Sequence, residues 1–140
     1  MGDYLSPDFE KAPGEMSALA LAHVGDAVFE LMARTYLCTQ GVLTAKKLHN
    51  GTVAMVSATA QAEAAERILP LLTEEELAVY KRGRNTHTNS VPKGCSLKQY
   101  HNATGLEALF GFLYISGNTK RLNSLFEIII SHNSGEQYAP

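Results

Sequence analysis

Residues 19–33 read LALAHVGDAVFELMA, and this stretch decides the fold. Apolar residues fill most of its positions, which is typical of a central helix covered on most sides. Residues 103–115, ATGLEALFGFLYI, have the same character. Asp26 lies in the first stretch and Glu107 in the second. An ionised carboxylate in an apolar helix is costly unless it meets hydrogen bonds, a cation or a metal.

Two such carboxylates predict one shared site, and a divalent metal would be its simplest ligand. Mg²⁺ commonly binds one or two protein carboxylates, keeps several waters and lets phosphate complete its shell. The alternative is that Asp26 and Glu107 each pair with an arginine or a helix N-terminus. Glu30 follows Asp26 by one turn, and a salt bridge to Arg34 is its expected role because this order and spacing are favourable.

Three glycines lie beside these acids: Gly25 precedes Asp26, and Gly105 and Gly111 flank Glu107. Glycine in a helix interior costs roughly 1 kcal/mol relative to alanine. We therefore expect these positions to allow two helices to approach closely and to bring the acids together.

Composition indicates one domain, with 140 residues that are 45% hydrophobic and 19% charged. The net charge of −2 carries no nucleic-acid signal for the whole molecule. No secretion signal or membrane span is expected, because the start is not basic and charges interrupt every apolar run. Cys38 and Cys95 form no CxxC pair, which favours a reduced cytoplasmic protein with buried cysteines.

Capping residues predict where the helices begin, and Glu76 would complete a capping box with Thr73. A break is expected at Asn50–Gly51. Without alternating segments or hairpin turns, the prediction is an all-α helical bundle. The expected helices cover residues 17–37, 44–72, 73–83, 96–115 and 119–132. The expected domain is residues 16–133, between an arm (1–15) and a tail (134–140).

Basic residues dominate residues 77–106, where Glu107 is approached without any other acid. Such a patch binds phosphate backbones by releasing counterions, and a stiff basic strip suits duplex RNA. The alternative is an ordinary solvated loop over residues 82–96. The candidate RNA-binding residues are Lys46, Lys47, Lys81, Arg82, Arg84, Asn85, His87 and Lys93; Lys98 and His101 share the acid-free segment.

Two motifs resemble the ribonuclease III family. AHVGDAVFE (residues 22–30) is similar to its signature helix, E-x-x-E-F-L-G-D-[AS], and GLEALFGFLY (105–114) is similar to its second acidic helix, D-x-x-E-A-x-x-G. The sequence ends where ribonuclease III would continue into its double-stranded-RNA-binding domain, so it is most similar to the Mini-III branch. KLHNGTVAMVSATAQA (47–62) and YKRGRN (80–85) also resemble that branch.

The resemblance implies that Asp26 and Glu107 are catalytic residues and metal ligands. The family's other acids fall on Leu19, Ala22 and Thr104. This thinner set is shared by the Mini-III branch, and it implies weak metal binding until RNA phosphate adds charge.

The implied function is Mg²⁺-dependent cleavage of double-stranded RNA by a homodimer, which leaves 5′-phosphate and 3′-hydroxyl ends. The implied role is maturation of the 23S ribosomal RNA precursor, helped by a ribosomal protein bound to that substrate. The first alternative is a non-catalytic helper that binds structured RNA with a degenerate site. The second is a helical interaction module whose acids form salt bridges.

Overall fold

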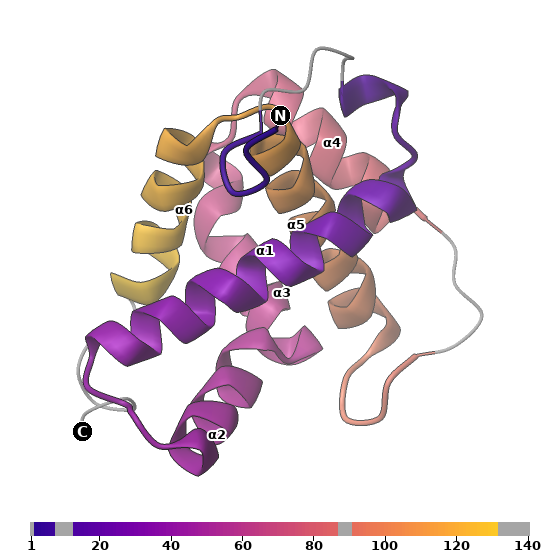
Figure 1. Ribbon diagram of the computed structural model, residues 1–140. Helices are drawn as coiled ribbons and strands as arrows, with labels where there is room; N and C mark the ends of the chain where they lie inside the picture. The colour runs from indigo at the N-terminus through magenta and orange to yellow at the C-terminus, as the bar shows by residue number, and fades with distance from the viewer. Residues whose placement is uncertain (1, 8–12, 87–90, 132–140) are drawn as a thin grey trace.

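The computed structural model describes residues 2–7, 13–86 and 91–131, which form a helical bundle without a strand in those ranges (Figure 1). The all-α prediction is confirmed. None of the helices in these ranges is long and apolar enough to cross a membrane. The helices are η1 (Pro13–Glu15), α1 (Ala18–Thr39), α2 (Ala45–Val56), α3 (Ala58–Ile68), η2 (Leu69–Leu71), α4 (Glu74–Arg84), α5 (Leu97–Ile115) and α6 (Thr119–Ser131).

Four helices begin at the predicted caps. The side chains of Ser17, Thr44, Thr73 and Ser96 each accept a hydrogen bond from a backbone N–H of the first turn. These bonds satisfy amides that have no partner within the helix. Thr73 also forms the predicted capping box with Glu76.

The core surrounds α5, which α1 crosses near the middle of both helices (Figure 1). No other pair of helices makes such extensive contact. Phe29 of α1 packs edge-on against Phe110 of α5 and Phe126 of α6, with ring centroids 5.2 and 5.8 Å apart. Edge-to-face aromatic pairs of this kind add to the stabilisation from buried area.

Glycines permit this crossing, as predicted. A Cβ atom at Gly25 would lie 1.6 Å from the carbonyl oxygen of Glu107, and one at Gly111 would lie 1.9 Å from that of Leu21. Gly105 likewise faces Tyr80 of α4, with ring and carbonyl atoms 2.8 Å from an added Cβ. The α1–α5 crossing is therefore close enough for the two backbones to touch.

The predicted break at Asn50–Gly51 is wrong. The helix α2 continues through both residues, and the chain breaks at Ser57, which ends α2 and caps α3. Gly51 serves packing instead, because a Cβ there would lie 3.0 Å from a Leu37 methyl group on α1. Close contact with α1 thus explains this glycine, and no turn is needed.

Two further expectations need correction. Arg82 and Arg84 were expected in a loop, but α4 extends through both and ends at Asn85. Both cysteines are free thiols; Cys38 is exposed near the end of α1 and Cys95 is partly buried. The expected tail, residues 134–140, lies outside the described residues.

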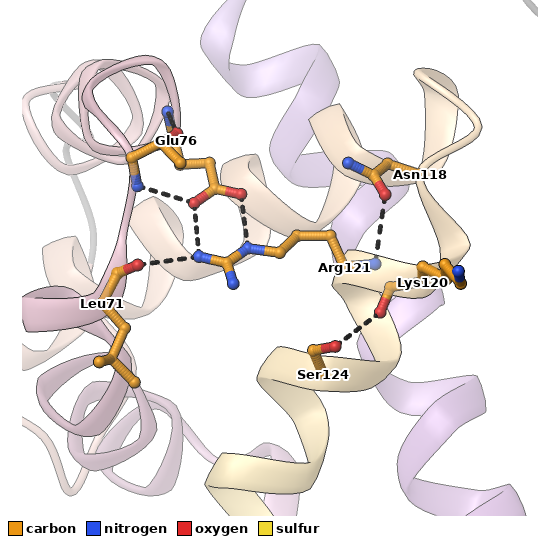
Figure 2. Close-up of polar contacts among 7 residues, drawn as sticks. Leu71, Glu76, Asn118, Lys120, Arg121 and Ser124 are labelled. Carbon is orange, nitrogen blue, oxygen red and sulfur yellow. Dashed lines mark hydrogen bonds and ion pairs between the residues drawn. The ribbon is translucent and has the colours of Figure 1, made fainter.

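An ion pair between Glu76 and Arg121 joins α4 to α6 (Figure 2). The guanidinium donates to both carboxylate oxygens, over 2.8 and 2.9 Å, and also to the carbonyl oxygen of Leu71. The side chain of Glu76 is 7% exposed and that of Arg121 is 28% exposed. The Arg121 hydrogen bonds hold the pKa of Glu76 below its usual value, although burial opposes them.

We expect Arg121→Met to lower the free energy of unfolding by about 2–3 kcal/mol, because it leaves the Glu76 carboxylate buried without its cation. Urea denaturation at pH 7 measures this loss. The difference from wild type should shrink below about pH 4.5, since the pair stabilises the fold only while Glu76 is ionised. Arg34→Met is the matched control: the Glu30–Arg34 pair is exposed, so its loss should cost less than about 1 kcal/mol. Equal effects of the two substitutions would contradict this account.

Candidate active site

Asp26 and Glu107 lie together at the α1–α5 crossing. Gly25 precedes Asp26, and the missing side chain there lets α1 rest on the backbone of Glu107 itself. Asp26 is exposed at the surface, whereas Glu107 is partly buried between the helices. The structure therefore brings together the two carboxylates that the sequence singled out.

The pair favours a shared proton when no cation is present. Burial and then the adjacent Asp26 raise the pKa of Glu107 from 4.5 to about 8, and Glu107 hydrogen-bonds Asp26. Two close carboxylates resist carrying two negative charges, particularly where water is partly excluded. A cation between them would relieve the same repulsion.

Gln61 is a member of the site that the sequence did not reveal. It lies on α3, its side chain is 2% exposed, and it hydrogen-bonds the carboxyl group of Glu107. That bond favours the ionised carboxylate and opposes the pKa shift caused by burial. The only sequence signal was a glutamine within an alanine-rich helix, and its spacing does not indicate a partner 46 residues away.

The positions that correspond to the family's other acids add no carboxylate. Leu19 is exposed, Ala22 is buried, and the Thr104 hydroxyl donates to the carbonyl oxygen of Tyr100 over 3.0 Å. Glu30 forms the predicted salt bridge with Arg34 at 2.9 Å. Among the described residues, no group of three or more His, Cys, Asp or Glu could hold a metal ion.

The predicted RNA-binding residues occupy two separate surfaces. Lys46 and Lys47 are exposed in the first turn of α2, which lies far from the end of α4 in Figure 1. The second surface contains the last turn of α4 and the following segment: Lys81, Arg82, Arg84, Asn85 and Lys93. His87 lies outside the described residues.

A cationic pocket of about 450 Å³ forms where α4 ends and α5 begins. It adds Lys98, His101 and Asn102 to the predicted Arg84 and Asn85, with Leu97 as its apolar wall. The buried Nε2 atom of His101 has no hydrogen-bond partner within the described structure. Cations and amide groups without a neighbouring acid are suited to phosphate oxygens.

Comparisons with known proteins agree on one family. Residues 19–118 match the ribonuclease III domain. Mini-ribonuclease 3 of Thermoanaerobacter sp. (strain X514) is 44% identical over 115 residues, covering 82% of this chain and 81% of that protein. Mini-ribonuclease 3 of Clostridium tetani is 38% identical over 143 residues, covering 96% and 95%.

A solved structure supports the same assignment. The crystal structure of a protein from Fusobacterium nucleatum is similar with a TM-score of 0.77 and 31% sequence identity, over 85% of this chain and 95% of that one. The chain therefore belongs to the ribonuclease III family, in its Mini-ribonuclease 3 branch, and is an endoribonuclease.

Proposed function

We propose that this endoribonuclease cleaves double-stranded RNA with Mg²⁺ held by Asp26 and Glu107. The observation that carries the proposal is the carboxylate pair at the α1–α5 crossing, in which Glu107 has a pKa of about 8. An acidic pair that is costly without a cation and open to solvent on one side suits a divalent metal site.

The donor set suits magnesium. Carboxylate oxygens are hard ligands, and Mg²⁺ often takes only one or two of them while water and substrate phosphate fill its remaining positions. When bound, the cation would lower the pKa of a coordinated water and orient it for in-line attack on a phosphodiester. Asp26, at the surface, faces the position from which RNA would approach, and Glu107 anchors the site from beneath.

The basic surfaces would hold the RNA backbone. The cationic pocket at the α4–α5 junction begins less than two helical turns from Glu107 along α5, roughly 8 Å by the rise of an α-helix. A duplex that is gripped there through its phosphates would be recognised by shape, as most double-stranded RNA is. Lys46 and Lys47 offer a second contact farther along the molecule.

Replacing Arg84 with alanine should reduce the salt dependence of RNA binding by about one unit of the slope of log K against log salt, since one phosphate contact is lost. Fluorescence anisotropy with a labelled RNA duplex, measured at several salt concentrations, gives this slope. Lys120→Ala is the control, because Lys120 is an exposed cation on α6, away from the pocket. If both variants keep the wild-type slope, the pocket does not bind RNA.

The working form is proposed to be a homodimer, so that each protomer cuts one strand. An apolar groove of about 500 Å³ runs along α1 beside α5 and α6, and it is a candidate for the dimer interface. Its lining includes Leu31, which is 54% exposed, an unusual exposure for a large apolar side chain next to a groove. The remaining lining residues are Leu5, His23, Val24, Ala27, Val28, Met32, Tyr114, Thr119, Leu122 and Asn123.

Leu31→Asp should convert such a dimer into monomers, because it would bury an unpaired charge in each copy of the interface. Sedimentation equilibrium should give about twice 15.2 kDa for the wild type and the single mass for the variant. The exposed Thr35→Asp, one turn further along α1, controls for added charge. A wild type that sediments as a monomer would contradict the dimer.

The proposed substrate is the 23S ribosomal RNA precursor in the cytoplasm, shaped by a bound ribosomal protein. This role is supported by the similarity to Mini-ribonuclease 3 across nearly the whole chain. The competing possibility, a helper that binds RNA without cutting it, would retain the basic surfaces but not need the carboxylate pair.

A substrate panel tests the proposed activity. Purified protein with Mg²⁺ should cleave an RNA duplex, but not the separated strands or a DNA duplex of the same sequence. The products should carry 5′-phosphate and 3′-hydroxyl ends, which end-specific ligation reports. Binding of the RNA duplex without cleavage would favour the non-catalytic helper instead.

A further inference from the structure

Gln61 is a buried polar residue whose presence packing does not explain. Its side chain is 2% exposed on the face of α3 that also buries Ala62, Ala64 and Ala65. Burying an amide without a partner costs about 1–3 kcal/mol, whereas leucine would fill a similar volume without that cost. The amide must therefore be judged by its partner.

That partner is Glu107, the buried member of the carboxylate pair. Three helices meet at this point: α1 contributes Asp26, α5 contributes Glu107, and α3 packs against α5 and contributes Gln61. Glu107 thus contacts one amide and one carboxylate. A glutamate side chain has three rotatable bonds, so a fixed donor is needed to hold its carboxyl group in one orientation.

We propose that Gln61 is a positioning residue for cleavage, whose amide N–H groups hold the Glu107 carboxylate so that its free oxygen faces the same cation as Asp26. This inference rests on the proposed function, since it assumes that the pair holds the catalytic metal. Partners that orient metal ligands in this way typically change metal affinity or activity by about 10–100-fold when they are removed.

The test compares Gln61→Leu and Gln61→Met, which keep the volume and remove the amide. Under single-turnover conditions on an RNA duplex, the cleavage rate at saturating RNA should fall about 10–100-fold, with RNA affinity unchanged. Binding of Mn²⁺ to RNA-free protein, followed by electron paramagnetic resonance, should weaken in both variants. A purely structural role would instead lower stability in urea and leave the rate of the folded protein unchanged.

Thr52→Val is the matched control. Thr52 is 4% exposed on α2 and donates to the carbonyl oxygen of Leu48, so this change also removes a buried polar group from the core. It should leave both Mn²⁺ binding and the cleavage rate unchanged.

The outcomes separate the two proposals. If wild type cleaves and both Gln61 variants match its rate and its Mn²⁺ affinity, the positioning role is overturned and the proposed function stands. If wild type neither cleaves the duplex nor binds Mn²⁺, the proposed function itself fails, and the role of Gln61 fails with it.

Discussion

Gly111→Ala is expected to lower the free energy of unfolding by about 3 kcal/mol or more, a large part of the 5–15 kcal/mol that stabilises a typical domain. The new Cβ would lie 1.9 Å from the Leu21 carbonyl oxygen and 3.0 Å from the backbone nitrogen of Gly25. Backbone atoms cannot rotate out of the way, so the α1–α5 crossing would have to open. The gain in helix propensity, roughly 1 kcal/mol, is too small to compensate.

Urea denaturation followed by circular dichroism measures this loss. Gly14→Ala is the control, because an added Cβ there has no atom within 4 Å, and its effect should be within about 1 kcal/mol of zero. If Gly111→Ala unfolds at the wild-type urea concentration, the two helices are not in backbone contact.

Glu107→Gln is expected to reduce the rate of RNA cleavage on the order of 1,000-fold. The substitution keeps the shape of the side chain but removes one of two proposed metal ligands, and several kcal/mol of transition-state stabilisation with it. Single-turnover cleavage of an RNA duplex in Mg²⁺ gives the rate. Glu127→Gln, an exposed acid on α6, should retain the wild-type rate.

The same substitution should stabilise the metal-free protein at alkaline pH. The pKa of Glu107 is about 8 in the folded protein against 4.5 as its ordinary value, so the folded state binds more protons between these values. The stability of metal-free wild type therefore falls as pH rises from about 4.5 to about 8. Glutamine does not ionise, and Glu107→Gln escapes this loss.

Melting temperatures in EDTA test this second effect. At pH 8.5 the variant should melt a few degrees above wild type, at about 2–4 °C per kcal/mol, and near pH 5 the two should converge. Mg²⁺ should reduce or reverse the advantage, because it binds only the folded wild type appreciably. A difference that does not change with pH would mean that Glu107 is not held protonated by its surroundings.

Local chemistry made much of the fold predictable. Ser17, Thr44, Thr73 and Ser96 cap their helices because each interaction spans only three residues of sequence. The close helix crossing was also predictable, since an interior glycine in an apolar helix has a cost that packing must offset. The site residues Asp26 and Glu107 followed from the cost of burying a carboxylate.

Features that depend on distant contacts were not predictable in this way. Gly51 looked like a break, but it packs against Leu37, which only the angle between α1 and α2 determines. The sequence indicated the capping role of Glu76, but not its ion pair with Arg121, 45 residues away. Gln61 joined the site for the same reason: α3 packs against α5, and no local pattern encodes that arrangement.

The most direct test of the central claim is single-turnover cleavage of an RNA duplex by wild type and Asp26→Asn, with RNA binding measured in parallel. The account predicts cleavage by wild type that EDTA abolishes, and no cleavage by Asp26→Asn despite unchanged binding of the duplex. Cleavage that persists in Asp26→Asn, or in wild type without any divalent cation, would contradict a metal site built on Asp26 and Glu107.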